Sequence, residues 1–298
     1  GYRSKHILKM IRSIFLAIIA TAISLFLIFK IRPKLVVGMG GYVSGPIGLA
    51  AILSRTKLVI HEQNAIPGLT NKILYRFANK VFEGFPGTFK QKHVLYSGSP
   101  IRKEIWLVNK KFQENLENPF RILVIGGSSG AKFFNNFLPK VMHRICSEKE
   151  ITVLHQTGRS DFAVTQELYR ALNLEDRVKV VPYVEAMDEA YRTHDLLLSR
   201  AGASTISEIL AVGINSILIP FPHSVDSHQD LNARFLADKG ACHTILEKDC
   251  TLDAVVSLVR KVGFNDEVRR RVISNISSIA IPNSAPIIVN SCMELFNA

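Results

Sequence analysis

Residues Arg121–Ala131 read RILVIGGSSGA, a run of apolar residues that passes directly into a glycine-rich segment. We predict a strand over Arg121–Ile125 and a turn at Gly126–Gly130 that opens a helix. Glycines let the backbone approach a phosphate closely, and a helix N-terminus offers free N–H groups to an anion. The segment lacks the Gly-Lys-Ser/Thr ending of a Walker A loop and is not GxGxxG. It therefore fits either a phosphate-binding loop or a tight turn without a ligand.

The same arrangement recurs on both sides of this segment. Six other apolar runs end in glycine, proline or polar residues: Leu35–Val37, Leu58–Ile60, Thr152–Leu154, Val178–Val181, Leu196–Leu198 and Ser216–Ile219. Cys242–Leu246 is one more candidate strand. Amphipathic stretches follow them, and strands that alternate with helices predict parallel sheets. Nearly continuous apolar strands are typical of sheets covered on both faces. The chain is therefore predicted to have an α/β fold.

A polar stretch that ends in proline, LVNKKFQENLENP, divides the chain at residues 107–119. We predict one α/β domain over residues 1–106 and a second over residues 120–277. The segment 278–298 contains the break IPNSAP and then a further helical stretch, which is a candidate to return to the first domain.

Composition limits the classes of partner. The 298 residues carry a formal net charge of +12, which favours phosphorylated ligands or anionic lipid. Nucleic acid is disfavoured because the sequence has no zinc-finger spacing and no aromatic RNA-binding signature. The four cysteines form no CxxC pair and no metal-ligand spacing, as expected for reduced thiols in a cytoplasmic protein.

The segment Ser13–Phe29, SIFLAIIATAISLFLIF, contains no charged residue and has basic residues on both sides. Three interpretations fit it: a short transmembrane helix, a secretory signal, or a helix of the first domain that lies on a membrane surface. We favour the third, because the basic residues within 5–34 can contact anionic headgroups and no small-residue cleavage site follows.

Polar residues gather where the predicted strands of the second domain end, which is where open parallel sheets bind ligands. Ser204 lies near the start of a predicted helix and is a candidate cap. Glu208 lies one turn further on, where a carboxylate can accept two hydrogen bonds from a ribose diol. A solvated glutamate at a helix start would show the same pattern.

A third polar cluster follows Pro220–Pro222. Gln229 is the preferred candidate there for an amide that binds sugar hydroxyls, and Asp226 and His228 are alternatives. The spacing of the histidines and carboxylates does not match HExxH, so no metal site is predicted. In the first domain, Asn64 follows a predicted strand, and Arg102 near the linker can reach a pyrophosphate.

Taken in order, these motifs resemble those of MurG-type enzymes, the UDP-N-acetylglucosamine:undecaprenyl-pyrophosphoryl-muramyl-pentapeptide transferases of peptidoglycan synthesis. The resemblance covers essentially the whole chain. It rests on GMGGYVSGP (38–46), HEQN (61–64), GLTNK (68–72), GSPIR (98–102), GGSSGA (126–131), HQTGR (155–159), SRAGASTISE (199–208) and PFPHSVDSHQDLNA (220–233).

The resemblance implies a GT-B fold of two Rossmann-like domains with parallel sheets that face a cleft. It implies transfer of N-acetylglucosamine from UDP, with inversion, to the lipid-linked acceptor at the cytoplasmic face of the bacterial inner membrane. This step serves cell-wall synthesis, cell shape and cell division. No cofactor and no metal are expected, in keeping with the missing Asp-x-Asp motif.

Site residues are implied by the same resemblance. The diphosphate would lie near Ser128, Arg102, Ser204 and Thr205, and the uracil would meet the backbone of Val184. The ribose would meet Glu208, the sugar hydroxyls would meet Gln229, and Asn64 would point into the cleft from the acceptor side.

The chain departs from the family pattern in several places. Ser129 stands where glutamine is usual, and Ser99 where asparagine is common. The family's glycine-rich GGTGGH segment has no match here, so we expect the first domain to be incomplete, and no catalytic base is assigned beyond Asn64 as a cleft candidate. Two alternatives remain: a nucleotide-sugar-binding fragment that is non-catalytic or depends on a partner, and another UDP-sugar enzyme of the same fold.

Overall fold

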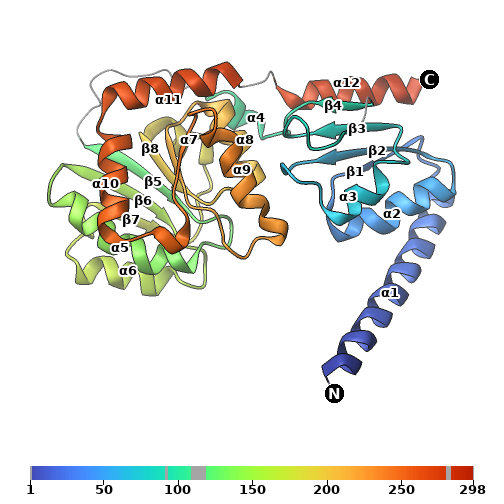
Figure 1. Ribbon diagram of the computed structural model, residues 1–298, viewed down its shortest axis with the longest axis horizontal. Coiled ribbons are helices and arrows are strands. Elements are labelled where there is room, and N and C mark those ends of the chain that lie inside the picture. Colours follow the sequence, from blue (N-terminus) through green and yellow to red (C-terminus); the bar gives the residue numbers. More distant parts are fainter. Residues whose placement is uncertain (1, 91–92, 109–118, 280–282, 298) are drawn as a thin grey trace. The chain divides into compact units, whose positions relative to one another are not determined.

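The computed structural model describes residues 2–90, 93–108, 119–279 and 283–297 (Figure 1). The chain divides into two compact units. The first comprises Gly1–Ser99 together with Asn283–Ala298, and the second comprises Pro100–Pro282. The sequence placed the linker at residues 107–119, of which 109–118 lie outside the described residues. Arg102 and the short helix that follows it belong to the second unit.

The first unit is built on a four-stranded parallel sheet in the order β1-β2-β3-β4. Its elements are α1 (Tyr2–Ile31), β1 (Leu35–Gly38), α2 (Gly41–Leu53), β2 (Lys57–Glu62), α3 (Leu69–Leu74), β3 (Lys80–Glu83), β4 (Val94–Tyr96) and α12 (Ser284–Asn297). Buried apolar residues of α2, β2 and β3 form the core, and Ile28 near the end of α1 joins it. The last helix is tied to this sheet, because Lys57 Nζ donates to the carbonyl of Leu295 at 2.8 Å.

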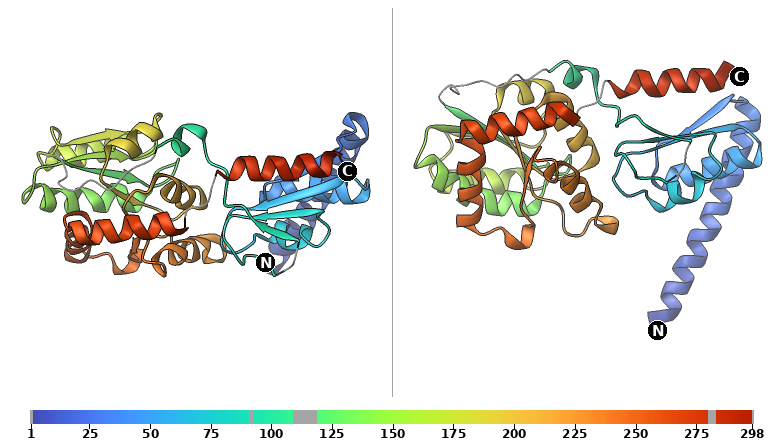
Figure 2. Two further views of the ribbon diagram at one scale, coloured as in Figure 1. Left: turned by 90° about the horizontal axis from the view of Figure 1, so that it is seen from above. Right: turned by 45° about the horizontal axis from the view of Figure 1, so that its top comes forward.

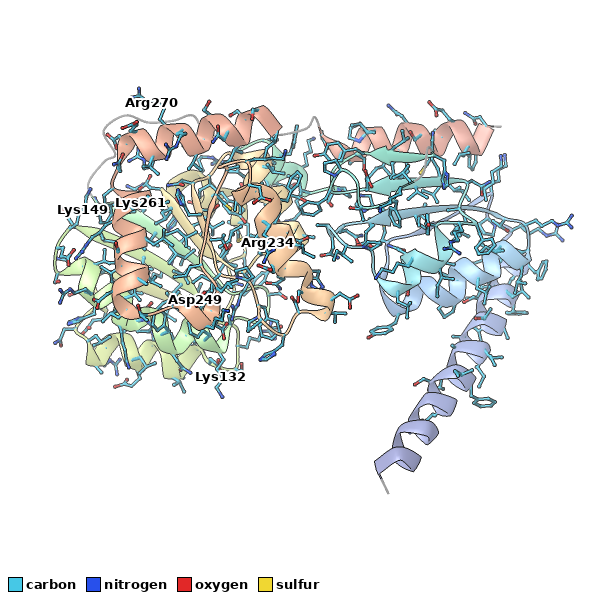
Figure 3. All side chains as sticks on the ribbon, viewed as in Figure 1. Lys132, Lys149, Arg234, Asp249, Lys261 and Arg270 are labelled. Carbon is cyan, nitrogen blue, oxygen red and sulfur yellow. The ribbon has the colours of Figure 1, made fainter. Side chains whose placement is uncertain are left out.

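Helix α1 packs on α2 through only a part of its surface. Thr21, Ser24, Leu25 and Ile28 form the covered face, and both hydroxyls bond back to carbonyls of their own helix. The rest of Arg12–Ile31 is largely exposed and extends away from the sheet and the other helices of the first unit (Figure 3). By length and composition, Arg12–Ile31 could cross a bilayer.

The second unit is built on a six-stranded parallel sheet in the order β10-β9-β8-β5-β6-β7. Its strands are β5 (Phe120–Ile125), β6 (Ile151–Gln156), β7 (Val178–Val181), β8 (Leu196–Ser199), β9 (Ser216–Leu218) and β10 (His243–Thr244). Its helices are α4 (Lys103–Trp106), α5 (Lys132–Cys146), α6 (Phe162–Ala171), α7 (Met187–Thr193), α8 (Ala203–Val212), α9 (His228–Ala237), α10 (Leu252–Gly263) and α11 (Asp266–Ile279), with the 3-10 turns η1 (Val225–Ser227) and η2 (Glu247–Asp249). Helices α5, α6 and α10 share one apolar core with the sheet (Figure 2).

The alternation predicted from the sequence is confirmed at every run that was named as a strand. Two strands of the first unit, β3 and β4, were not predicted. In β3, Lys80 and Glu83 leave only two apolar residues between them, and β4 is only the three residues Val94–Tyr96, so that no long apolar run marks either strand. The predicted strand Cys242–Leu246 shortens to the two residues of β10.

Candidate functional site

The sheet of the second unit has a topological switch point between β5 and β8. From β5 the chain adds β6 and β7 on one side, and then adds β8, β9 and β10 on the other. Ligands bind at the carboxyl ends of the strands at such a point, because the two flanking loops diverge there. The two loops are Gly126–Ala131 after β5 and Arg200–Gly202 after β8.

The loop after β5 is held by a backbone contact that only glycine permits. Gly130 has φ 77°, and a Cβ at this position would overlap the carbonyl oxygen of Thr157. Gly158 has φ 79° and meets the carbonyl of Ser129 in the same way. The loops after β5 and β6 therefore lie against one another, and Ser128 is exposed at the tip of the first.

A hollow of about 460 Å³ opens beside this loop, at the carboxyl ends of β5, β6 and β7. Its lining comes from three successive loops: Ser128 and Ser129, then Arg159 and Ser160, then Pro182 and Tyr183. The sequence analysis assigned no role to Arg159, although it closes the quoted motif HQTGR. A guanidinium beside two hydroxyls and a helix start suits an anionic ligand.

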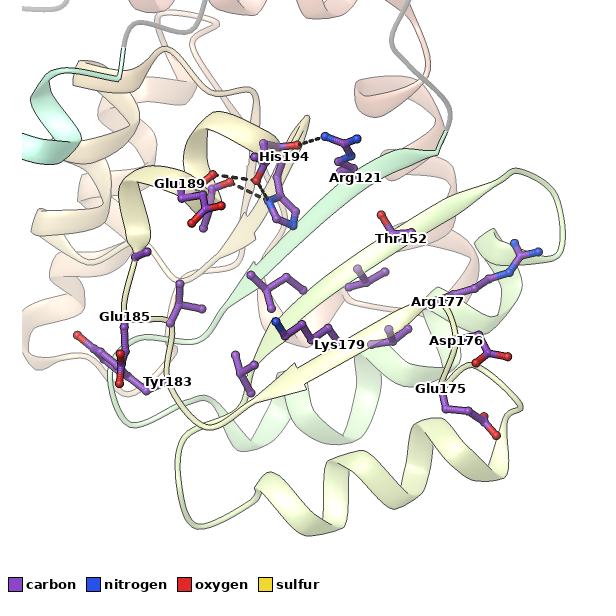
Figure 4. Close-up of a pocket in the computed structure, with 18 residues that line it drawn as sticks. Arg121, Thr152, Glu175, Asp176, Arg177, Lys179, Tyr183, Glu185, Glu189 and His194 are labelled. Carbon is purple, nitrogen blue, oxygen red and sulfur yellow. Dashed lines mark hydrogen bonds between the residues drawn. The ribbon is translucent and has the colours of Figure 1, made fainter.

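Val184, the expected uracil contact, follows the loop after β7 and is buried. Its N–H donates to the side-chain Oε1 of Gln156 at 2.8 Å, so this donor is already engaged. Val184 also lines a groove of about 700 Å³ beside β6 and β7. Figure 4 shows Tyr183 and Glu185 at one end of this groove and Asp176 and Arg177 at the other.

Glu208 lies on α8 and is held by two groups from other elements of the same unit. The hydroxyl of Tyr191 on α7 donates to Glu208 Oε2 at 2.7 Å. Burial raises the pKa of Glu208, while the Tyr191 hydrogen bond and the charge of Arg102 act to lower it. Burial and the neighbouring carboxylate raise the pKa of Tyr191 well above its ordinary value. The hydroxyl thus stays protonated and orients the carboxylate.

The structure brings Arg102 close enough to Glu208 for its charge to act on the carboxylate, although 106 positions separate the two residues in the sequence. Arg102 is the N-cap of α4, which packs against α7 and α8. A cation and a carboxylate are therefore neighbours in the second unit.

Gln229, the expected sugar contact, is the second residue of α9 and holds two loops with one side-chain atom. Its Oε1 accepts from the N–H of Phe221 at 3.0 Å and from the N–H of Ala201 at 3.3 Å. The amide Nε2 is the atom that remains suited to a sugar hydroxyl, because it is a donor. Just before α9, Asp226 and Ser227 both adopt positive φ, 49° and 53°, which fixes the direction in which the helix starts.

The loop around Gln229 rests on Arg200, which is buried directly after β8. The guanidinium donates to the carbonyls of Ile219 and Pro220, both at 3.1 Å, and pairs with Glu247 at 2.6 Å. It also lies over the ring of Phe134, 4.7 Å from its centroid. Arg200 belongs to the quoted motif SRAGASTISE without an expected role of its own, and its bonds to Ile219 and Pro220 indicate that it supports the loop.

Ser204 and Thr205 occupy the first turn of α8, as the motif implied. The capping role considered for Ser204 is wrong, because the helix begins at Ala203 and its N-cap is Gly202. Ser207 bonds back to the carbonyl of Ala203 at 2.9 Å. The hydroxyl of Ser204 is exposed at the helix start, close to where backbone N–H groups favour an anion.

Asn64 lies in the first unit, apart from the other predicted site residues, which all belong to the second. Its N–H and its side-chain Nδ2 both donate to Glu62 Oε1, at 3.0 and 3.2 Å. The other oxygen of this buried carboxylate accepts from Gly68 N–H and Asn71 Nδ2. Glu62 thus organises the whole HEQN loop and orients Asn64.

The chain matches two family models along most of its length. Residues 1–83 match the glycosyltransferase family 28 N-terminal domain, and residues 121–280 match the glycosyltransferase family 28 C-terminal domain. A protein of Shewanella amazonensis named UDP-N-acetylglucosamine–N-acetylmuramyl-(pentapeptide) pyrophosphoryl-undecaprenol N-acetylglucosamine transferase is 37% identical over 99% of this chain and 82% of its own length. The chain belongs to the MurG family of glycosyltransferases.

Solved structures agree with this membership in the MurG family. The MurG crystal structure from Acinetobacter baumannii is 33% identical, with a TM-score of 0.81 over 94% of this chain and 80% of that one. A UDP complex of MnaA from S. aureus has a TM-score of 0.69 at 11% identity and shares only the fold. The expected GT-B α/β fold is therefore confirmed.

Proposed function

We propose that this chain transfers N-acetylglucosamine from UDP-N-acetylglucosamine to undecaprenyl-pyrophosphoryl-muramyl-pentapeptide, with inversion at the anomeric carbon. The observation that carries the proposal is the match to the named transferases over almost the whole chain. The geometry of the second unit supports it. Glu208, which Tyr191 orients, lies in the same unit as Arg102 and as the starts of α5 and α8, which follow strands β5 and β8.

Each group has a part in the proposed reaction. Glu208 accepts hydrogen bonds from the ribose diol, and Gln229 donates to the sugar. The diphosphate lies by Ser128 and the first turn of α8, with Arg102 nearby. As the acceptor hydroxyl forms a bond to the anomeric carbon and gives up its proton to a general base, the bond from that carbon to the phosphate oxygen breaks, and UDP leaves with its electron pair and the negative charge. Preorganised N–H groups and a cation stabilise that charge.

The test is an activity assay with the lipid acceptor and UDP-N-acetylglucosamine, in which both UDP and the disaccharide lipid are measured. We expect Glu208→Ala to weaken donor binding by about 1–3 kcal/mol, since it removes hydrogen bonds to a charged group. The exposed Glu167→Ala, on α6, is the matched control. An unchanged KM for the donor in Glu208→Ala would remove the ribose role.

The same assay separates the alternatives. A protein that consumes UDP-N-acetylglucosamine without acceptor and releases a different UDP-sugar would be an epimerase of the same fold. A chain that binds the donor but transfers only after a family N-terminal segment is added would be a partner-dependent fragment. Transfer by the chain itself supports the proposal.

We also propose that α1 docks the first unit on the cytoplasmic face of the inner membrane, peripherally and through anionic lipid. Leu16, Ile19 and Phe26 are 53%, 40% and 64% exposed, and such an apolar surface is costly in water. Basic residues before and after this segment suit anionic headgroups.

Flotation with anionic vesicles tests this docking. We expect the triple change Leu16→Ser, Ile19→Ser and Phe26→Ser to release the protein, whereas the exposed pair Val164→Ser and Val225→Ser in the second unit should not. Release of the unchanged protein by alkaline carbonate supports surface docking, and retention after that wash would mean that α1 spans the bilayer.

A further inference from the structure

Gln156 stands at the end of β6, between the loops that follow its two neighbouring strands. It is 3% exposed. Its Nε2 donates to the carbonyl of Gly127 in the loop after β5, at 2.8 Å. Its Oε1 accepts from the N–H of Val184 in the loop after β7, also at 2.8 Å. One buried amide therefore joins two loops that are not adjacent in the sheet.

Only a neutral amide of this length satisfies both loops. A carboxylate can accept from Val184 but cannot donate to the Gly127 carbonyl, and an apolar side chain of the same shape does neither. Because the site is buried, water cannot readily replace either bond when Gln156 is substituted. The two loops would then lose their fixed position relative to each other.

The loops after β5 and β6 have other bonds that do not involve Gln156. Asn135 Nδ2 donates to the carbonyl of Thr157 at 2.9 Å, and the backbones meet at Gly130 and Gly158. The N–H groups of Thr157 and Gly158, in the loop after β6, donate to the carbonyls of Val181 at the end of β7 and of Pro182. Gln156 is the side chain that extends this framework as far as Val184.

We propose that Gln156 is a positioning residue that couples the diphosphate loop at Gly127 and Ser128 to the base loop at Val184. The inference rests on the proposed function, in which the first loop receives the diphosphate and the second receives the uracil. A nucleoside diphosphate contacts both loops at once, so it gains from their fixed separation. A ligand that contacts one loop gains little.

Calorimetric titration of the full chain with UDP, uridine and inorganic pyrophosphate tests the coupling. In Gln156→Met we expect UDP affinity to fall about tenfold, because the two hydrogen bonds that fix the separation of the loops are lost. Uridine and pyrophosphate affinities should change by less than about threefold, because each needs one loop. In steady state, the KM for UDP-N-acetylglucosamine should rise while kcat stays near that of the unchanged chain.

Gln156→Glu is the second variant, and the exposed Gln166→Met is the control. The carboxylate keeps the bond to Val184 and loses the one to Gly127, so UDP affinity should fall while uridine affinity is kept. Equal weakening of all three ligands, in either variant, would overturn the coupling and leave a merely structural glutamine. Failure of the unchanged chain to bind UDP would instead refute the proposed function.

Discussion

Tyr191→Phe removes one hydroxyl beside Glu208 and preserves the shape of the side chain. In the structure this hydroxyl donates at 2.7 Å to the carboxylate expected to hold the ribose. Tyr191 is 1% exposed, so a water molecule cannot easily replace the lost donor. The other group that acts on the carboxylate, the charge of Arg102, remains.

The size of the effect follows from the kind of bond. A hydrogen bond to a charged group contributes about 1.5–3 kcal/mol, and one pKa unit corresponds to about 1.4 kcal/mol. Burial already raises the pKa of Glu208, and removal of the donor raises it further. Donor binding needs the ionised carboxylate, so the acidic limb of kcat/KM should move to higher pH.

The sign for stability follows from the same shift. Between the ordinary pKa of the unfolded carboxyl and the raised pKa of the folded one, the folded protein binds more protons than the unfolded chain. Its stability therefore falls as pH rises through that window. Because Tyr191→Phe extends the window upward, its cost in unfolding free energy should be larger near neutral pH than in acid.

On two of the helices packed against α8, Arg234 pairs with Asp230 in α9, and Arg269 pairs with Asp266 in α11. Besides burial, the groups that act on the pKa of Glu208 are Tyr191 and Arg102. The expected shift in kcat/KM therefore reports on these two residues.

Profiles of kcat/KM for the donor and urea unfolding across pH measure both effects. Tyr169→Phe is the matched control, because it also removes a buried hydroxyl. Tyr169 lies on α6 and its hydroxyl bonds to His155 at 2.9 Å, not to Glu208. It should lower stability without moving the acidic limb. An acidic limb that stays in place in Tyr191→Phe would refute the reasoning.

Three further outcomes are expected. Gly130→Ala should lower the free energy of unfolding in urea by roughly 3 kcal/mol or more, because φ is positive and the added Cβ overlaps Thr157. Gly41→Ala is the control and should lower it by about 1 kcal/mol, because Gly41 has φ 76° but open space around it. Glu62→Gln should cost about 2–4 kcal/mol by the same measurement and raise the KM for the acceptor, since an amide donor would face the donors of its loop. Arg200→Met should lower stability by about 2–3 kcal/mol and raise the donor KM, because it frees the loop that carries Gln229 and leaves a carboxylate unpaired.

The local pattern predicted the framework well. In RILVIGGSSGA the change from an apolar run to glycines predicts a strand, a turn and a helix, and β5 and α5 follow that order. These features depend on residues close together in sequence. The strand β3 was missed because Lys80 and Glu83 interrupt its apolar run, and its place in the sheet comes from pairing with β2.

The partners of the site residues could not be predicted, because they depend on packing between distant elements. Glu208 is marked by its motif, but nothing in the sequence pairs it with Tyr191 on another helix. The glutamine of HQTGR is visible as a motif, yet its bonds to Gly127 and Val184 follow only from the sheet order β5-β6-β7.

The central claim is that the second unit binds a UDP-sugar through Glu208. Calorimetric titration of the 298-residue chain with UDP-N-acetylglucosamine, and with UDP-glucose for comparison, tests it most directly. The account predicts selective binding of the first ligand that Glu208→Ala weakens by about five- to 150-fold, the equivalent of 1–3 kcal/mol. A folded chain that binds neither ligand, or whose affinity Glu208→Ala leaves unchanged, would contradict it.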